Sequence, residues 1–454
     1  MKEVYDYIEN HKNEFLDELF RFVRIPSVSP LPSYEKEIRR CAEFASGIME
    51  RCGLSAQIFE TANNPVVFGQ TEQIPGRPTV LIYGHYDVQP EGDRALWNSD
   101  PYEPFIRDGR VYARGIGDNK GQIFAHLKAL EAYRAVKGTP PINLKYLIEG
   151  EEEIGSIDLG PFVSNHLDLL KADITIWSDS NIHASGRPLI ILGLKGISSM
   201  KITVQGPKDD VHSQWASVLP NPVWKLIRIL SALKDEEGRV RIPGFYEDVQ
   251  GPGAKERAAI RNIPADLTPF ARLWGSPDFD GTMNSEEFFT RFMYEPTINI
   301  GCIHAGSETG TKNIVPHEAS CWIDMRLGPG QSSEEKRRDL IRYIESQGLS
   351  GVTVEGTGSD AAFTSMDNPF VAPTIEIIRD LWGQEPIVYP GLGGSGPFSV
   401  FNNILKAPCI FVPFADAAQH DHAPNENIPI KLLLQGAKIG AAIIDRFSRI
   451  DTAI

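Results

Sequence analysis

The spacing of hydrophobic and polar positions predicts an α/β region at the start of the chain. In residues 1–24, apolar side chains recur on one helical face, and the Ile25-Pro26 step ends this helix because the residue before proline avoids the α region. Runs that are apolar throughout then predict strands buried on both faces of a largely parallel sheet. The clearest runs are residues 79–83, 144–148 and 174–177, with a helix predicted over 121–133 between the first two.

The pattern changes in the middle of the chain. Strand-like residues 197–204 precede a helix that begins after Asn221-Pro222, and residues 235–292 read as an irregular stretch rich in glycine, proline and charge. The elements that follow complete a β-α-β-β-α-β order, which is typical of a split βαβ fold. They are strands at 297–303 and 319–327, a helix from Ser332 to Gly348, and a strand at 352–355.

The first pattern returns near residue 369, which indicates that one domain interrupts another. We expect an α/β domain of residues 1–196 and 366–454, with a mostly parallel sheet, and an inserted α+β domain of residues 197–365. The returning elements are helices over 371–381 and 431–447 and a strand over 409–413.

Composition narrows the class of protein. Of the 454 residues, 41% are hydrophobic, which is too apolar for a disordered chain and too polar for a membrane protein. The formal net charge of −15 argues against a nucleic-acid binder and against a basic membrane-surface protein. The first residues lack the apolar run of a signal peptide, and five scattered cysteines without a C-x-x-C pair are typical of reduced thiols. We therefore expect a cytoplasmic protein.

Histidine and carboxylate side chains follow the predicted strands. His85 lies just beyond the first strand, and Asp87 is placed to orient its imidazole. Glu152 and Glu153 belong to an acidic run after the second strand, and Asp179 follows the third. Open parallel sheets bind their ligands at these carboxyl ends, so the side chains are candidates for one site.

Two further segments carry candidate groups. Asp118 lies just before a predicted helix, and residues 419–426 read Gln-His-Asp-His-Ala-Pro-Asn-Glu. Taken singly, these groups have structural explanations: a buried core histidine, a helix N-cap, a solvated acidic turn or a surface loop. Together they supply ligands for two metal ions if one carboxylate bridges the ions. Because no cysteine takes part, the set suits zinc, manganese or cobalt.

Such a pair of ions defines a reaction class. Two metal ions about 3.5–4 Å apart activate a shared water and polarise a carbonyl group. A neighbouring carboxylate that is not a ligand takes the proton of that water. Glu152, beside the candidate ligand Glu153, is the natural choice for this base.

Five runs, in order, resemble the motifs of one enzyme superfamily. They are similar to those of the co-catalytic di-metal metallopeptidases, which include aminoacylase, carboxypeptidase G, succinyl-diaminopimelate desuccinylase and the carnosinase-type dipeptidases. The likeness covers essentially the whole chain, and the first run together with Gly393–Pro397 favours the dipeptidase branch. The five runs are His-Tyr-Asp-Val-Gln-Pro (85–90), Gly-Ile-Gly-Asp-Asn-Lys-Gly (115–121), Glu-Gly-Glu-Glu-Glu-Ile-Gly-Ser (149–156), Ser-Asp-Ser (178–180) and His-Ala-Pro-Asn-Glu (422–426).

The resemblance implies a zinc-exopeptidase-like catalytic domain that binds two divalent ions, zinc foremost, with manganese or cobalt as alternatives. Asp118 would bridge the ions, with His85 and Asp179 on one ion and Glu153 and His422 on the other. A cis peptide bond after Asp118 is also implied.

The resemblance assigns roles to the remaining groups as well. Glu152 would be the general base and acid, and Asp87 would support His85. The inserted domain would be a ferredoxin-like lid that also forms a homodimer, and its His212 would reach the partner subunit's site to stabilise the oxyanion. The alternative for His212 is a position in a surface loop.

A carboxylate-binding group is implied too. Arg326 is similar to the arginine that binds the substrate carboxylate in the family, and Gly394 and Ser395 would assist it. The alternative for Arg326 is a salt bridge at a strand edge.

Three departures from the family pattern concern the substrate pocket. Gly391-Leu392 stands where dipeptidases carry Arg-Glu, Gln214-Trp215 follows His-Ser where glycine is usual, and Asn368 replaces a histidine. These changes leave the reaction class intact and put the substrate in question.

We therefore predict hydrolysis of an amide bond in dipeptides or short peptides by a bridging hydroxide, with Glu152 as the base. A deacylase or desuccinylase of N-acyl amino acids would use the same chemistry, and activity on N-acetyl amino acids but not on dipeptides selects it. A non-catalytic metal-binding relative would bind metal without turnover.

Overall fold

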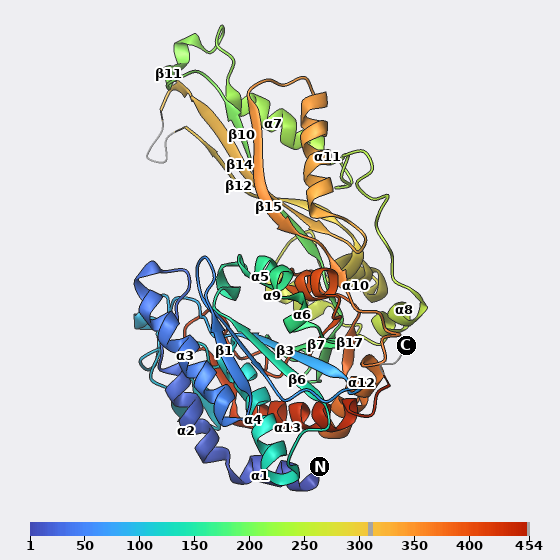
Figure 1. Cartoon of the computed structure of the whole chain (residues 1–454). Coiled ribbons are helices and arrows are strands. Elements are labelled where there is room, and N and C mark those ends of the chain that lie inside the picture. The colour runs from blue at the N-terminus through green and yellow to red at the C-terminus, as the bar shows by residue number, and fades with distance from the viewer. Residues whose placement is uncertain (307–311, 452–454) are drawn as a thin grey trace. The chain divides into compact units, whose positions relative to one another are not determined.

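The chain forms two compact units, which a computed structural model describes for residues 1–306 and 312–451 (Figure 1). Unit 1 comprises Met1–Leu192, Phe363–Pro390 and Val400–Ile454, and unit 2 comprises Gly193–Ala362 and Gly391–Ser399. The segment Gly391–Ser399, which the sequence pattern places with the α/β domain, therefore groups with unit 2.

Unit 1 is built on an eight-stranded mixed sheet. Its centre is parallel, as the sequence predicts, because the third to sixth strands in space form the parallel pairs around residues 80, 146, 176 and 410. Antiparallel pairs lie toward both edges. In spatial order the strands are β1 (Ser55–Phe59), β2 (Val66–Gln70), β6 (Asn143–Glu149), β3 (Thr79–His85), β7 (Ile174–Trp177), β18 (Cys409–Phe411), β8 (Leu189–Ile191) and β17 (Ile387–Tyr389).

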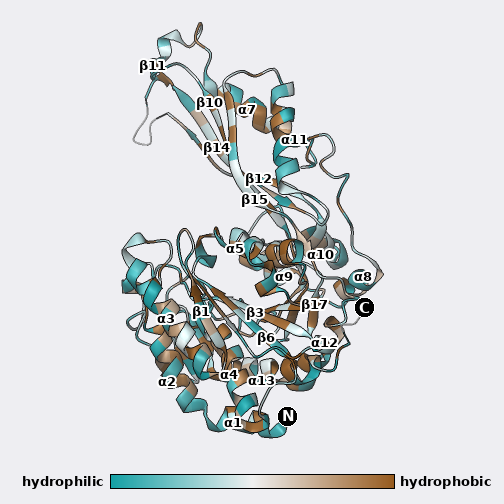
Figure 2. Cartoon of the chain, viewed as in Figure 1, coloured by the Kyte–Doolittle hydropathy of each residue, from teal (hydrophilic) through white to brown (hydrophobic). Residues whose placement is uncertain are grey.

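Helices cover both faces of this sheet. Successive side chains of a strand point to opposite faces. On one face, Val80 and Ile82 of β3 belong to the hydrophobic core that the sheet forms with its helices. On the other face, Tyr83 contacts Phe401, with ring centroids 4.7 Å apart. Burial on both faces explains the uninterrupted apolar runs, and Figure 2 shows hydrophobic strands beside helices with hydrophilic outer faces. The helices are α3 (Glu35–Arg51), α4 (Lys120–Lys137), α5 (Leu159–Asn165), α6 (Leu167–Leu170), α12 (Val371–Trp382) and α13 (Ile430–Phe447), with the π-helical turn η5 (Val400–Leu405).

The chain begins with two helices, and the predicted single helix over residues 1–24 is wrong. They are α1 (Lys2–Asn10) and α2 (Lys12–Val23), and the backbone turns at His11, where φ is −96° and ψ is 14°. The apolar face continues across the break, since Val4 and Phe15 are both buried. A periodicity pattern therefore cannot detect a break of one residue.

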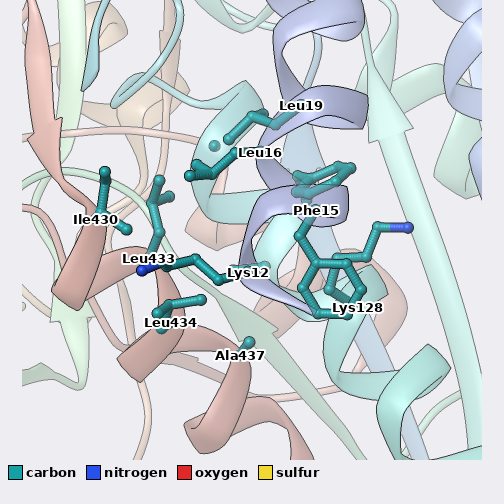
Figure 3. A pocket seen from close by; sticks show the side chains of 12 residues that line it. Lys12, Phe15, Leu16, Leu19, Lys128, Ile430, Leu433, Leu434 and Ala437 are labelled. Carbon is teal, nitrogen blue, oxygen red and sulfur yellow. The ribbon is translucent and has the colours of Figure 1, made fainter. Parts of the chain in front are cut away.

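A small apolar pocket lies where α2, α4 and α13 meet (Figure 3). Phe15, Leu16, Leu19 and Leu433 line it, together with Lys12 and Lys128. Its described lining contains no carboxylate or imidazole group, so we regard it as part of the packing of unit 1.

Short elements complete unit 1. A three-stranded sheet contains β4 (Phe105–Arg107), β5 (Arg110–Tyr112) and β19 (Asn427–Pro429). Single turns of 3-10 helix are η1 (Pro32–Tyr34), η2 (Arg94–Leu96) and η3 (Glu152–Ile154).

Unit 2 contains an antiparallel sheet with the predicted β-α-β-β-α-β order along the chain. Helices α7 (Pro222–Leu233) and α11 (Ser333–Ser346) pack on the sheet, and their apolar faces form one core with Met200, Ile202 and Ile323. In spatial order the strands are β12 (Thr297–Ala305), β14 (Glu318–Leu327), β10 (Gly196–Gln205) and β15 (Val352–Ser359). This order is that of a ferredoxin-like fold.

The stretch 235–292 is helical in part, so the expectation of an irregular segment is wrong. Helices of seven to ten residues fit between its glycines and prolines, and Asn284 caps the last of them by accepting a hydrogen bond from the Glu287 N–H. They are α8 (Ala254–Arg261), α9 (Thr268–Trp274) and α10 (Ser285–Tyr294). Smaller elements of the chain are β9 (Gly193–Leu194), β11 (Val211–His212), η4 (Ser213–Trp215), β13 (Ile314–Val315) and β16 (Ala362–Phe363).

Two expectations from composition can be compared with the structure. All five cysteines are free, as the sequence predicts, and four of them are buried. Across the part of the chain that the structure describes, none of the helices combines the length and the apolar character that crossing a bilayer requires.

Candidate metal centre

His85 is the last residue of β3, and its imidazole is fully buried. Nδ1 lies 3.1 Å from the carbonyl oxygen of Asp87 and 3.3 Å from its Oδ1. Nε2 lies 3.0 Å from Asp118 Oδ1 and 3.3 Å from Asp179 Oδ2. Burial lowers the pKa of His85, but hydrogen bonds to Asp118, Asp179 and Asp87 outweigh it and hold the pKa well above its usual value. In the neutral imidazole that a metal ion requires, a proton on Nδ1, held by Asp87, would leave the Nε2 lone pair on the side of Asp118 and Asp179.

Asp118 lies between two histidines. Its Oδ1 faces His85, and its Oδ2 lies 3.0 Å from Nε2 of His422. Burial raises the pKa of Asp118, but hydrogen bonds from His422 and His85 outweigh this effect and hold the pKa below its usual range. The peptide bond between Asp118 and Asn119 is cis, as the resemblance implies.

Asn119 joins the ends of two strands beside this carboxylate. Its Oδ1 accepts a hydrogen bond from the His85 N–H at 3.3 Å, and its Nδ2 donates to the Ser178 carbonyl at 2.6 Å. The sequence reasoning did not single out Asn119, although it lies inside the run 115–121.

Asp179 follows β7, the parallel neighbour of β3. Because the carboxyl ends of these strands meet at the same edge of the sheet, Asp179 comes within reach of His85. Burial and the nearby Asp118 raise the pKa of Asp179 to about 6. The Ser180 N–H donates to its Oδ1 at 2.6 Å, which orients the carboxylate.

Glu153 and His422 form the second part of the centre. Glu153 lies on η3, just beyond β6, and its Oε2 is 3.1 Å from His422 Nε2. Gln89 donates to Glu153 through its backbone N–H at 3.2 Å and through Nε2 at 3.0 Å. Hydrogen bonds to Asp118 and Glu153 raise the pKa of His422 to about 11.

Asp87 supports both parts of the centre. Besides its contacts to His85, it accepts hydrogen bonds from the N–H groups of Glu152 at 3.3 Å and Glu153 at 3.1 Å. The Ser29 hydroxyl donates to it at 2.6 Å. Asp87 therefore ties the end of β3 to the turn that carries both glutamates. Ser29 is a supporting residue that sequence reasoning missed.

Glu152 lies partly buried beside these groups. Burial raises the pKa of Glu152 well above its usual value, and Asp179, Asp118 and Glu153 raise it further against the opposing effect of His85. A carboxyl group with a raised pKa accepts a proton near neutral pH more readily than an ordinary glutamate does.

Among the described residues, two groups of side chains are arranged to hold a metal ion. The candidate ligand atoms within each group lie within 4.8 Å of one another, and Asp118 belongs to both groups. Imidazole nitrogens and carboxylate oxygens without a thiolate suit zinc, manganese or cobalt. The structure thus brings together the five candidate ligands, which are His85, Asp118 and Asp179 in one group and Asp118, Glu153 and His422 in the other.

Arg326, Gly394 and Ser395 belong to unit 2. Arg326 is the penultimate residue of β14, and its Nη1 donates to the Ser395 hydroxyl at 3.0 Å. Its Nε lies 3.6 Å from Asp324 Oδ2, and about a third of the side chain is exposed. Gly394 lies next to Ser395 in a glycine-rich segment in which Gly393 packs against the ring of Phe292.

His212 lies on β11, at the end of unit 2 where β14 begins. Asp210 accepts a hydrogen bond from the N–H of His317, which immediately precedes β14, at 3.0 Å. The His212 side chain is exposed, and its Nδ1 accepts from the Gln214 N–H at 3.1 Å. Within unit 2, His212 and Arg326 therefore lie toward opposite ends of β14.

Comparisons with known proteins give matches along nearly the whole chain. The sequence model of peptidase family M20/M25/M40 matches residues 81–446. The chain is 27% identical to the beta-Ala-His dipeptidase of Homo sapiens, over 97% of this chain and 92% of that protein. It is 26% identical to the Cys-Gly metallodipeptidase DUG1 of Saccharomyces cerevisiae, over 98% of each. The solved M20 family metallo-carboxypeptidase Sso-CP2 from Sulfolobus solfataricus has a TM-score of 0.88 at 31% identity, covering 96% of this chain and 100% of that chain.

Proposed function

Since the chain belongs to peptidase family M20/M25/M40 and is a hydrolase of peptide bonds, we propose that it is a metal-dependent dipeptidase. The observation that carries this proposal is that two clusters of histidine and carboxylate side chains, each arranged to hold a metal ion, share Asp118. The names of the relatives, beta-Ala-His dipeptidase and Cys-Gly metallodipeptidase, support dipeptides as the substrate class.

We propose that the centre holds two divalent ions. His85 and Asp179 bind one ion, Glu153 and His422 bind the other, and Asp118 binds both. Zinc is the first choice because imidazole and carboxylate ligands suit it, with manganese or cobalt as alternatives. When bound, the ions polarise the scissile carbonyl group and lower the pKa of a water molecule.

The protein's own contribution to the chemistry is proton transfer and positioning. Glu152 takes the proton from the attacking water and donates it to the amine nitrogen as the carbon–nitrogen bond breaks, which yields one carboxylic acid and one amine. Its partial burial and its raised pKa support this role. Asp87 holds His85 in one tautomer and fixes the turn that presents Glu152.

We propose that Arg326 binds the substrate carboxylate. A planar guanidinium pairs with a carboxylate through two parallel hydrogen bonds. The hydrogen bond from Arg326 to Ser395 holds the guanidinium at the glycine-rich segment. The backbone at Gly394 can approach a ligand closely because it carries no Cβ.

We propose that the enzyme is a homodimer and that His212 acts in the partner subunit's site. His212 lies near the start of β14, and Arg326 lies eight residues farther along this strand, which is roughly 26 Å at about 3.3 Å per residue. An extended dipeptide spans only about 7 Å. One substrate therefore cannot contact Arg326 and His212 of the same unit 2.

The edge strand β12 supports pairing with a second copy. It lies at the border of the unit 2 sheet, with Ile300 and Ile303 43% and 54% exposed. Next to its end, Trp224 and Ile227 of α7 and Ala305 line one groove. An uncovered edge strand with apolar rather than charged side chains is suited to association with another strand.

A substrate panel tests the proposed function. Purified enzyme loaded with zinc is assayed on dipeptides, including Cys-Gly and β-Ala-His, and on N-acetyl amino acids, with and without a chelator. We expect chelator-sensitive hydrolysis of dipeptides. Hydrolysis of N-acetyl amino acids alone would contradict the proposal and select the deacylase, and dipeptide hydrolysis that a chelator leaves unchanged would contradict the role of metal.

A further inference from the structure

Glu426, the last residue of the run His-Ala-Pro-Asn-Glu, is fully buried and accepts four hydrogen bonds. Its Oε2 accepts from Arg114 Nη1 at 2.8 Å and from the Gly115 N–H at 2.9 Å. Its Oε1 accepts from the N–H groups of Gly117 at 2.9 Å and Asp118 at 3.1 Å. One carboxylate thus accepts hydrogen bonds from three backbone N–H groups of the loop that ends at Asp118.

The same residue fixes a second loop. Its carbonyl oxygen accepts a hydrogen bond from the Ala113 N–H at 3.0 Å, and His422 lies four residues before it on the same segment. The two loops are also in close contact, because a Cβ at Gly117 would lie only 2.6 Å from Cδ of Gln419. Glu426 therefore links the loop of Asp118 to the loop of His422.

The backbone at His422 needs such support. Its φ is +56°, in the left-handed region, which costs a residue with a Cβ about 1 kcal/mol. Its side chain is 57% exposed, so packing alone does not hold it. Conformations of this kind persist where the surrounding structure determines them, and the anchor at Glu426 is close enough in sequence to do so.

We infer that Glu426 is a positioning residue that fixes Asp118 against His422, so that the metal position formed with Glu153 and His422 depends on it more than the other position does. This inference rests on the proposed two-metal function. Two ligands of that position lie on the loops that Glu426 joins. In the other position, His85 ends strand β3 and Asp179 follows strand β7 of the main sheet. The hydrogen bonds of Glu426 go to residues 113–118 and not to these strands.

The chemistry of the four contacts requires a carboxylate of full length. In Glu426→Gln, the NH₂ group would face two donors, so one pair of hydrogen bonds is lost and replaced by donor–donor contact. In Glu426→Asp, the charge that pairs with Arg114 remains, but the shorter side chain cannot reach both pairs of N–H groups. Both variants should therefore loosen Asp118 relative to His422.

The test is zinc binding to the metal-free full-length protein, measured by competition with a chromophoric chelator. We expect wild-type enzyme to bind two ions. Both Glu426 variants should bind one ion within about threefold of wild type and the other about 10–100-fold more weakly, the usual effect of losing a group that holds a metal ligand. Excess zinc should then restore kcat with little change in KM.

Glu18→Gln is the matched control. Glu18 is also a buried carboxylate of unit 1, and it accepts hydrogen bonds from Arg51 and Lys128, remote from the centre. This control should bind both ions as wild type does. It shows that the loss of a buried ion pair is not by itself enough to weaken one metal position.

Each outcome decides between the alternatives. Equal weakening of both ions, or wild-type affinity for both, in a Glu426 variant would overturn the inference and leave the proposed function standing. A wild-type enzyme that binds fewer than two ions would instead contradict the proposed function. Thermal melting of the metal-free proteins checks folding, and if Glu426→Gln does not fold, Glu426→Asp decides by the same criterion.

Discussion

The Oδ2 atom of Asp118 lies 3.0 Å from Nε2 of His422, although the two residues come from distant parts of unit 1. The same carboxylate meets His85 on its other side. Among the described residues, Asp118 is therefore the candidate ligand that both halves of the centre share, and several measurable properties follow from this arrangement.

Zinc affinity should rise with pH. Neighbouring Asp118 and Glu153 raise the pKa of His422 to about 11 in the metal-free protein, so His422 is protonated at neutral pH. A metal ion must displace this proton before it can bind. We expect the apparent affinity for zinc to increase by up to about tenfold per pH unit for each proton released. Calorimetry in buffers of different ionisation enthalpy measures the released protons, and an affinity independent of pH from 6 to 8 would contradict this prediction.

Glu152→Gln should abolish turnover and spare metal binding. The amide keeps the size of the side chain but cannot accept a proton, so kcat should fall by about 10²–10⁴-fold. Zinc content by mass spectrometry should remain that of wild type, because Glu152 is not among the proposed ligands. Activity near that of wild type would show that another group carries the proton.

The convergence of several site residues could be predicted from the sequence. His85 ends β3, whereas Asp179 and Glu153 follow β7 and β6, and the carboxyl ends of parallel neighbours meet at one edge of a sheet. Asp118 and His422 lie on loops, whose positions depend on hydrogen bonds such as those of Glu426 and Asn119. Such contacts leave no periodic pattern, so residue types alone connect these two segments to a metal site, and the motif resemblance is what singles out His422 and makes Asp118 the bridging group.

The fold was less predictable where single residues or backbone contacts decide it. The break at His11 interrupts a helix without interrupting its apolar face. Residues 391–399 group with unit 2, where the Leu392 carbonyl accepts a hydrogen bond from the Lys195 N–H at 3.1 Å. A backbone hydrogen bond is independent of side-chain type, so the sequence pattern carried no sign of it.

His126 should make the stability of unit 1 sensitive to acid. Its ring is buried, its Nε2 lies 2.8 Å from the Ser178 hydroxyl, and burial lowers its pKa to about 4. In the unfolded chain, His126 binds a proton below about pH 6.5, whereas in the folded protein it does so only near pH 4. The contribution of the neutral ring to stability is therefore complete above pH 6.5 and is lost as the pH falls toward 4. The loss should reach about 3 kcal/mol.

Unfolding of metal-free wild type and His126→Gln by denaturant, between pH 4 and pH 7, tests this prediction. Glutamine can retain the contact with Ser178 but does not titrate in this range. The free energy of unfolding of the variant should depend less steeply on pH, and equal slopes would contradict the prediction.

Arg326→Ala should weaken the binding of substrates that carry a free carboxylate. Loss of a charged hydrogen-bond partner costs about 1.5–3 kcal/mol, so KM for a dipeptide should rise by about 10–100-fold. Hydrolysis of the same dipeptide with an amidated C-terminus should change little. An equal loss with both substrates would argue that Arg326 has only a structural role.

His212→Ala and Glu152→Gln should complement each other if His212 acts in the partner subunit's site. Each variant alone should be inactive. After random exchange of subunits in an equal mixture, about a quarter of all sites should have both groups intact, because half of the dimers are mixed and each mixed dimer has one intact site. Activity that stays at the level of the separate variants after proven exchange would argue that each chain completes its own site.

Anomalous X-ray scattering at the zinc absorption edge, from crystals grown with zinc, tests the central claim most directly. Two peaks about 3.5–4 Å apart are expected, one beside His85 and Asp179 and the other beside Glu153 and His422, with Asp118 in contact with both. A single peak, or peaks away from these side chains, would contradict the two-metal centre.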